Sequence, residues 1–466
     1  MTLFRTLVDT AFSGVSLLRL EHPSVRRLVS GRTGERHLRD GHHLALFAPL
    51  PPHTGAGVHR PLSFIQYGAK HGWRIDGFAG SAPDKESQHG EQLLARVPAA
   101  ATLHVVPPDS RVPSHRFFPR VDGGFTLALA HANYAIDALR QDPPDVVLAS
   151  GPPFFTFVAA RFVARHFRVP FVLDYRDEWT ECPFDFVTKN SADLRWERRC
   201  LAEADAVLFA TESFLKHQLE VFPELDARRA HVLPNGWDPD DFAIEPEERS
   251  SIPVEKETIL RIAHVGSLAG HTPPFEFLES VRQLLTGKPE WIPRLRISFV
   301  GRRSRSADAA IRAFPYSDVL ETVDQLGKRA AIRRMRDADV LLVLSAPGLE
   351  RYLPSKLFEY LASRRPVLIY GSAGESSALI ETLEAGTLSR PGSGEALGDA
   401  LARLRALDLS SHENAVTAWL QEHRRDVLSA RAFSTIDSVI SRSSLEGASL
   451  GAGVRDAPSR IAWPEA

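Results

Sequence analysis

The sequence predicts an α/β protein with two doubly wound parallel sheets of similar size and a cleft between them. Short apolar runs alternate with helix-length segments through most of the chain. This alternation occurs in two successive series, and a stretch rich in Glu, Pro and Ser separates them. The length of 466 residues is enough for two or three domains with sizeable cores.

Helix-length segments lie between several strands of the first series, so we expect parallel strands joined by crossover helices. The strands of this series are predicted at residues 44–50, 73–79, 103–106, 146–150, 171–175, 206–210 and 231–233. Its clearest helical segments are 126–140, 155–168 and 194–203. The second series has predicted strands at 260–265, 295–300, 340–344 and 367–370.

The same pattern divides the chain into six predicted parts. They are an N-terminal helical extension (1–40), a first α/β domain (41–243), a linker (244–258), a second α/β domain (259–412), closing helices (413–442) and a flexible tail (443–466). The linker and the tail have the polar, Pro- and Gly-containing composition of chain that does not pack.

The N-terminal segment has apolar residues at helical spacing. It does not resemble a signal peptide, because Asp9 interrupts the apolar run, and the chain has no apolar run of about 18 residues that could cross a membrane. We favour a helix packed on the protein's own core. The alternative is peripheral contact with a membrane surface. The apolar positions are Leu3, Phe4, Leu7, Val8, Phe12 and Val15.

Composition excludes several classes of protein. With 56 basic and 58 acidic residues the net charge is −2, which argues against a nucleic-acid-binding protein. Two cysteines, Cys182 and Cys200, exclude a disulfide framework and favour a cytoplasmic location, at most peripheral to the inner membrane face. We predict no metal site, because Asp238, Asp240 and Asp241 are better explained as helix-capping residues.

A glycine-containing loop follows the first predicted strand. Gly55 and Gly57 would let the backbone approach an anion, at which the next helix would point its positive N-terminus. A plain strand-to-helix loop explains the pattern equally well, because the third glycine of a dinucleotide fingerprint is missing. Gly57 is a candidate for binding the donor of a group-transfer reaction, and Arg60 is a candidate for binding its acceptor.

Polar residues also end the strands at 146–150 and 171–175. Charges at the end of an apolar strand cost free energy unless they are paired or used. An ion pair of Arg176 with Asp174 or Asp177 is the structural interpretation. In the functional interpretation, Asp177 or Glu178 orients an acceptor hydroxyl or acts as a base. Ser150, Arg176 and Glu178 are therefore candidates on the acceptor side.

Glycines end two strands of the second series. Gly266 and Ser267 follow the strand 260–265, and Arg302 follows a glycine after 295–300. A phosphate could approach these backbones closely, and Arg302 could neutralise a diphosphate. A solvent-exposed arginine is nearly as good an explanation.

The segment after the strand 340–344 carries the strongest signal. Pro354 and Ser355 suit a helix start, so the free amides from Ser355 to Leu357 could hold a phosphate. Lys356 adds a point charge for a diphosphate. Glu359 lies on the same helical face and could accept hydrogen bonds from a ribose diol. The alternative is a surface ion pair between Lys356 and Glu359.

Taken together, three segments resemble the retaining GT-B glycosyltransferases of family four. They are Pro-Asn-Gly-Trp-Asp at 234–238, the segment 354–362 and Pro-Val-Leu at 366–368. The resemblance covers roughly residues 44–440, and the run 174–179 looks like that of one subgroup. It implies two Rossmann-like domains, with the acceptor bound mainly by the first and a nucleotide sugar mainly by the second. It also implies a closing helix that returns to the first domain, and metal-independent transfer with retention.

The resemblance assigns the donor ribose to Glu359, and the leaving diphosphate to Lys356 and nearby amides. Three positions depart from the family pattern. Arg351 stands where a second glutamate often contacts the sugar, Ser267 stands where a cation is common, and Ser150-Gly151-Pro152 replaces a frequent histidine.

We therefore predict a nucleotide-sugar-dependent glycosyltransferase with no further cofactor. Its acceptor would be a glycan, a lipid-linked glycan or a small secondary metabolite. Lys356, Arg302 and Asp177 are the predicted catalytic residues. The predicted donor-binding residues are Glu359, Ser355, Leu357, Gly266, Ser267, Gly57 and Arg351. A nucleotide-sugar epimerase, a phosphorylase and a degenerate, non-catalytic partner protein are the alternatives.

Overall fold

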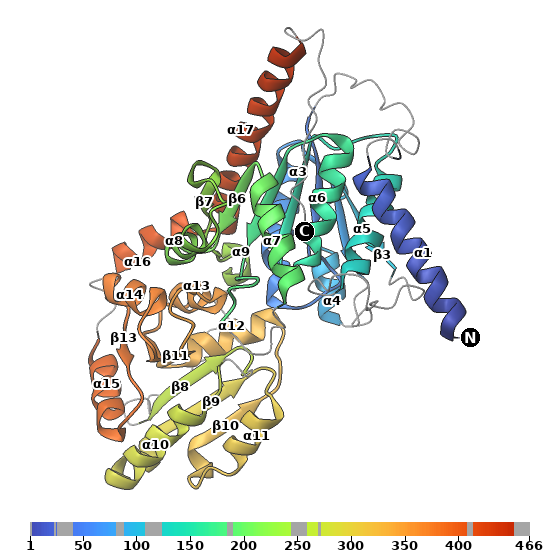
Figure 1. Cartoon of the computed structure of the whole chain (residues 1–466). Helices are drawn as coiled ribbons and strands as arrows, with labels where there is room; N and C mark the ends of the chain where they lie inside the picture. Colours follow the sequence, from blue (N-terminus) through green and yellow to red (C-terminus); the bar gives the residue numbers. More distant parts are fainter. Residues whose placement is uncertain are drawn as a thin grey trace.

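The computed structural model describes residues 2–22, 25, 41–80, 88–107, 124–183, 190–243, 259–268, 272–407 and 413–451. It has two parallel sheets, each in its own domain, with the first domain above the second in Figure 1. The predicted linker at 244–258 lies outside the described residues, as does most of the predicted tail.

The first sheet has seven strands in the order β3-β2-β1-β4-β5-β6-β7. They are β1 (His43–Phe47), β2 (Arg74–Gly80), β3 (Ala101–Val106), β4 (Val146–Gly151), β5 (Phe171–Tyr175), β6 (Ala206–Phe209) and β7 (Ala230–Val232). Every residue of the central strands β1, β4 and β5 is buried, which explains their continuous apolar runs. The strand order reverses between β1 and β4.

The second sheet has six strands in the order β10-β9-β8-β11-β12-β13. They are β8 (Leu260–Val265), β9 (Leu295–Val300), β10 (Leu320–Val323), β11 (Val340–Ser345), β12 (Val367–Gly371) and β13 (Gly386–Ser389). The order reverses between β8 and β11. The predicted fold class, two doubly wound α/β domains, is confirmed.

Two strands were not predicted, and both are sheet edges. The edge strands β10 and β13 are short and half exposed, with polar residues among the apolar ones. An edge strand needs only one buried face, so its sequence lacks the apolar run that marks a central strand.

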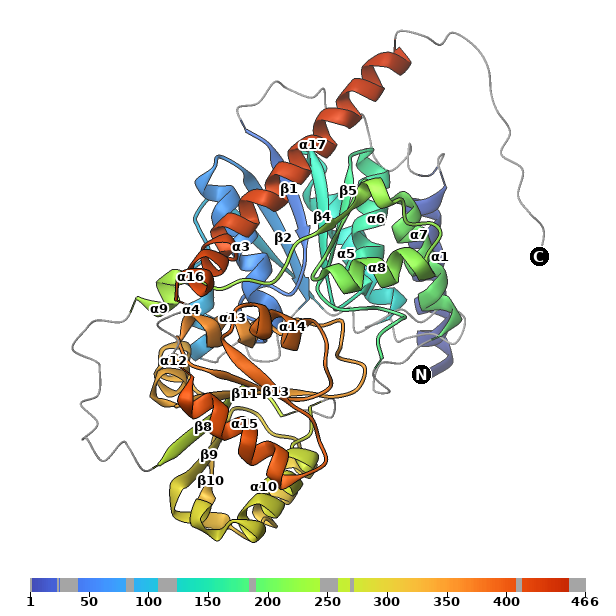
Figure 2. The same ribbon diagram turned by 90° about the vertical axis from the view of Figure 1, so that its left-hand side faces the viewer.

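Helices cover both faces of the first sheet. They are α3 (His59–Lys70), α4 (Gln88–Leu94), α5 (Phe125–Ala138), α6 (Phe155–Phe167), α7 (Ser191–Glu203), α8 (Glu212–Val221) and the short α9 (Pro239–Phe242). One hydrophobic core cluster packs helices α5, α6, α7 and α8 on one face of the sheet. Another packs α3 and the C-terminal helix α17 (Arg425–Gly451) on the opposite face. In Figure 2, α17 runs along the first domain beside α3. The helix extends beyond residue 442, where we expected the tail to begin.

The second sheet is covered in the same way. Its helices are α10 (Phe275–Gly287), α11 (Arg305–Arg312), α12 (Lys328–Asp337), α13 (Ser355–Ala362), α14 (Glu375–Thr382), α15 (Gly394–Ala406) and α16 (Glu413–Glu422). Short 3-10 helices occur in both domains: η1 (Ala56–Val58), η2 (Ala227–Arg229), η5 (Pro289–Arg294) and η6 (Ser317–Val319). Side-chain oxygens cap several helix starts, as Thr211 does for α8 and Asp238 does for α9.

The N-terminal helix α1 (Thr2–Glu21) packs against α5 and α6. Leu20 is buried, and Glu21 accepts a hydrogen bond from Arg161 at 3.1 Å. The opposite face is exposed to solvent and carries Leu7, Val15 and Leu18. Among the helices of the described ranges, none is long and apolar enough to cross a membrane.

The chain passes between the domains at two adjacent places. Trp237, just before α9, donates its amide hydrogen to the His423 carbonyl, and its own carbonyl accepts from the Arg425 amide. A Cβ atom at Gly236 would lie 2.6 Å from the His423 oxygen, so this close approach requires glycine. The predicted turn at 234–238 is therefore also the contact between the two passages.

Candidate active site

A cavity of ≈ 540 Å³ lies between the domains, beyond the carboxyl ends of the central strands. Its walls come from loops that follow β1, β5 and β6 in the first domain, and β8, β9 and β11 in the second. Both sheets reverse their strand order here, at β1/β4 and β8/β11. Ligands of doubly wound folds bind at such reversals.

Most of the predicted site residues line this cavity. They are Gly57, Arg60, Arg176, Asp177, Gly266, Ser267, Arg302, Arg351, Ser355, Lys356 and Glu359. Leu357, Ser150 and Glu178 do not line it, because all three side chains are buried. The Leu357 amide donates to the Pro354 carbonyl at 2.9 Å, so Leu357 offers the cavity neither a side chain nor a free N–H group.

Lys356 lies near the N-terminus of α13 and is held by a buried histidine. His264 donates from Nδ1 to the Leu342 carbonyl (3.0 Å), which leaves Nε2 to accept from Lys356 Nζ (3.3 Å). Burial, and then the charge of Lys356, holds the pKa of His264 well below its usual range. The imidazole is therefore neutral, and the other hydrogens of the Lys356 ammonium are available to a ligand.

Burial also makes the charged form of Lys356 less stable, since it lowers the pKa of this ammonium to about 8. The stem of Lys356 crosses Gly266, where φ is +146° and a Cβ atom would lie 3.0 Å from Nζ. Tyr360 anchors the helix by accepting a hydrogen bond from the Val265 amide at 2.8 Å. The strand-end glycine thus makes room for the lysine.

Glu359 faces the cavity one turn further along α13. The ion pair that we considered with Lys356 does not form between these two described side chains. Glu359 Oε1 instead accepts from the ammonium of Lys328, the first residue of α12. Both side chains are mostly buried, at 14% and 22% exposure.

Arg302 and Thr272 complete the second-domain wall of the cavity. Arg302 is exposed, and its guanidinium forms no hydrogen bond or ion pair with another described residue. The neighbouring Arg303, by contrast, donates to Asp308 and Asp324. The Thr272 hydroxyl is buried, and no residue in the described ranges forms a hydrogen bond with it. Arg302 and Thr272 therefore have hydrogen bonds left to give to a ligand.

The first-domain wall is organised around the buried Asp174. Arg60 donates to Asp174 from Nε (3.1 Å) and Nη2 (2.5 Å), and Ser150 Oγ donates to it at 2.7 Å. Arg60 Nη1 also donates to the carbonyls of Leu233 and Pro234. Arg60 and Ser150 thus connect β4, β5 and the segment at Leu233 and Pro234. Because Ser150 is fully buried, it cannot contact an acceptor.

Arg176 and Asp177 lie on the loop after β5. Arg176 donates to the Pro152 carbonyl, and its guanidinium packs so closely on Gly57 that a Cβ there would lie 2.2 Å from Nη1. Asp177 is exposed to the cavity. Desolvation by the protein groups around it raises the pKa of the Asp177 carboxyl, while the positive charge of Arg176 opposes this shift. Asp177 is therefore the more accessible group of the two.

Glu178 forms a clasp between the domains. Its carboxylate accepts from Arg351 Nε (2.7 Å) and Nη2 (2.9 Å), and from the Tyr352 hydroxyl (2.9 Å). The Thr211 hydroxyl donates to the Arg351 carbonyl at 2.6 Å. Glu178 was predicted on the acceptor side, but its carboxylate is buried within this clasp and does not line the cavity, so the structure does not offer it to an acceptor.

The first domain is similar to a known protein family. Residues 39–236 match the model of the glycosyl transferase 4-like domain, and this match covers less than half of the chain. It agrees with the resemblance to family four noted in the sequence. No curated protein matches the sequence.

Solved structures share the fold of this protein over most of its length. HepE from Anabaena, in complex with UDP and glucose, has a TM-score of 0.63 and 14% identity, covering 85% of this chain and 100% of that chain. A trehalose-phosphate synthase from Burkholderia vietnamiensis has a TM-score of 0.63, 13% identity and the same coverage. WaaG, a glycosyltransferase involved in lipopolysaccharide biosynthesis, has a TM-score of 0.56 and 17% identity, covering 84% and 98%. These likenesses show the GT-B fold.

Sequence reasoning missed three residues that line the cavity, Thr272, Lys328 and Tyr352, and the buried His264 that holds Lys356. Only Lys328 had a usable signal, because basic residues at a helix N-terminus oppose the helix dipole and need an anion nearby. His264 sits in an apolar strand, and Tyr352 depends on a partner in the other domain. Within the described ranges, no group of three or more His, Cys, Asp or Glu residues could hold a metal ion.

Proposed function

We propose that this protein is a glycosyltransferase that transfers a sugar from a nucleoside diphosphate sugar to a hydroxyl acceptor, with UDP as the first nucleotide to test. The observation that carries the proposal is the second-domain wall beside the start of α13, where Lys356 and Arg302 face the cavity and no carboxylate of the described part of the chain pairs with them. A diphosphate needs such a concentration of cations and free amides. HepE, a structural neighbour, is described with UDP and glucose, which supports the choice of UDP.

In this proposal Lys356, Arg302 and the first amides of α13 stabilise the leaving group. The bond from the anomeric carbon to the diphosphate oxygen breaks, and its electron pair stays on that oxygen. The charge that develops there lies against donors held in place before the reaction, which is the most effective form of electrostatic stabilisation. Glu359 accepts hydrogen bonds from the ribose diol and sets the position of the nucleotide.

We place the acceptor at the first-domain wall, near Asp177. This carboxyl group is accessible and can orient the attacking hydroxyl or take its proton. Retention at the anomeric carbon and transfer without a metal follow from the resemblance to family four and form part of the proposal. The anomeric configuration of the product, read by NMR, and the rate with and without EDTA test these two statements.

Thermal shift is the first test of the proposal. UDP, GDP, TDP, ADP and their sugars are screened, because a ligand that binds the native state raises its melting temperature. We expect one nucleoside diphosphate to raise the melting temperature of the native protein and of Lys288→Ala, an exposed surface control, but not of Lys356→Ala. If no nucleotide raises it, or if Lys356→Ala responds like the control, the proposed donor site is wrong.

We also propose that the exposed face of α1 contacts a membrane surface where a lipid-linked acceptor resides. This face carries Leu7, Phe12, Val15 and Leu18, exposed by between 38% and 65%. Such a stripe gains free energy at the lipid–water boundary. Sedimentation with anionic phospholipid vesicles should be lost when Leu7 and Val15 are both changed to Ser, with activity on a soluble acceptor unchanged. Equal sedimentation of the double variant would contradict this contact.

A further inference from the structure

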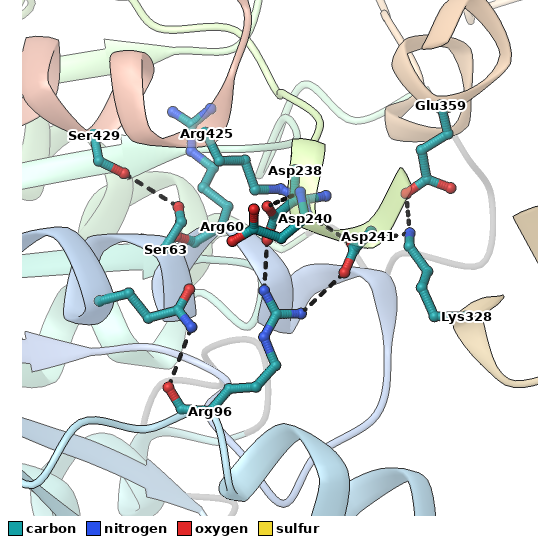
Figure 3. A network of polar contacts seen from close by, with 11 residues as sticks. Arg60, Ser63, Arg96, Asp238, Asp240, Asp241, Lys328, Glu359, Arg425 and Ser429 are labelled. Atoms are coloured by element: carbon teal, nitrogen blue, oxygen red, sulfur yellow. Dashed lines mark hydrogen bonds and ion pairs between the residues drawn. The ribbon is translucent and has the colours of Figure 1, made fainter. Parts of the chain in front are cut away.

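Lys328 links the donor carboxylate to the segment that joins the domains. Its ammonium donates to Glu359 and lies 3.9 Å from Asp241 Oδ2 on α9, as Figure 3 shows. Lys328 lines the 540 Å³ cavity and also a second hollow of ≈ 1250 Å³, which Asp241 lines as well. One side chain thus stands between two separate spaces.

Asp241 connects Lys328 to the first domain. Its Oδ1 accepts from Arg96 at 3.4 Å, and its Oδ2 lies 3.8 Å from Arg425 at the start of α17. Arg96 also donates to Asp238 at 2.5 Å. Arg96 and Arg425 belong to parts of the chain packed on the first sheet, whereas Glu359 belongs to the second domain. The charges therefore alternate in sign along a continuous row from one domain to the other (Figure 3).

The row has a consequence for Glu359. A carboxylate accepts up to four hydrogen bonds, so a ribose diol can bind Glu359 while Lys328 keeps its place. The ammonium keeps Glu359 ionised and limits its rotamers, which lowers the entropy lost on binding. Asp241 in turn attracts the Lys328 ammonium, which lies 3.9 Å from its buried Oδ2, and no described residue donates a hydrogen bond to that oxygen.

We propose that Lys328 is a positioning residue for donor binding, which holds Glu359 for the ribose diol and ties it through Asp241 to the first domain. This inference rests on the proposed function. Since Arg96 and Arg425 hold the other end of the row, nucleotide affinity depends on the arrangement of the two domains seen here. Asp241 affects affinity from a place outside the donor cavity.

The test measures the dissociation constants of UDP and of 2′,3′-dideoxyuridine diphosphate by calorimetry. We expect Lys328→Met to weaken the binding of UDP about tenfold and Asp241→Asn to weaken it about threefold. Both effects lie within the range of interaction energies measured between neighbouring residues. Neither change should alter binding of the dideoxy nucleotide, which lacks the diol. In the double variant the effect of Asp241→Asn should vanish, because the proposal has Asp241 act on the nucleotide through Lys328. Lys328→Arg should restore most of the affinity.

Arg329→Met is the matched control. Arg329 is the next residue of α12, is exposed, and should leave UDP binding unchanged. Circular dichroism checks that each variant is folded. Unchanged UDP affinity in Lys328→Met, equal losses with both nucleotides, or additive effects of the two changes would each overturn the inference. If the unmodified protein binds no nucleoside diphosphate at all, the proposed function fails instead.

Discussion

On the first-domain side of the cavity, most charged side chains bind one another, whereas on the second-domain side several have hydrogen bonds left to give. Arg60 donates to Asp174 and two carbonyls, and the buried Glu178 accepts from Arg351 and Tyr352. Lys356 and Arg302 face the cavity and have no carboxylate partner among the described residues. The comparison teaches that an arginine beside the cavity stabilises the fold when its N–H groups are hydrogen-bonded within the protein, and can bind a ligand when they are not.

The largest effect should come from breaking the first wall. Arg60→Met leaves the buried Asp174 without its main partner, and this should lower the free energy of unfolding by about 3–5 kcal/mol, read from denaturant unfolding. Arg302→Met, the matching change on the second wall, should lower activity and shift stability by no more than about 0.5 kcal/mol. Equal loss of stability in both variants would remove the distinction between the walls.

The next effect tests the second wall. Lys356→Ala should reduce kcat by about 100- to 1000-fold, because a donor aimed at the developing charge is lost. Release of nucleoside diphosphate measures the rate, and Lys288→Ala serves as the control. Turnover like that of the unmodified protein, with the fold intact, would show that the leaving group departs elsewhere.

A smaller effect is expected from pH. Burial lowers the pKa of Lys356 from its ordinary value of 10.5 to about 8, so the ammonium loses its proton as pH rises through 8. Affinity for a nucleoside diphosphate should be constant below pH 8 and fall above it, by up to about tenfold per pH unit. Lys356→Arg, which stays charged, should abolish this decline in calorimetric titrations from pH 7 to 10.

The lowered pKa of Lys356 also affects the stability of the fold, and here the effect of rising pH is favourable. Between pH 8 and 10.5 the unfolded chain holds a proton on Lys356 that the folded protein has released. The contribution of this group to the free energy of unfolding therefore rises with pH in that window and is lost as pH falls through 8. Denaturant unfolding of the native protein and of Lys356→Met at both ends of the window checks the sign.

The smallest effect should be that of Ser150→Ala. Its hydroxyl donates to Asp174 in the core, so we expect a loss of about 1 kcal/mol of stability and no change in kcat/KM. A fall in kcat/KM without a change in the melting temperature would place Ser150 on the acceptor side after all.

Much of the fold followed from local patterns. The bounds predicted for β5, β8 and β9 agree with the structure, since most residues of each strand are apolar and buried. The helix start at Pro354 and Ser355 was readable for a similar reason, because capping depends on neighbours in sequence. The edge strands β10 and β13 were not readable, because half of each faces solvent.

The sequence by itself determined two doubly wound domains, a cavity at the strand ends and the residue types that could enter it. The tertiary structure decided which charges pair. Asp174 pairs with Arg60, 114 residues away, and not with its neighbour Arg176. Glu178 pairs with Arg351, 173 residues away in the other domain. Ion pairing depends on distance and burial in space, and neither is encoded in the spacing of residues along one strand.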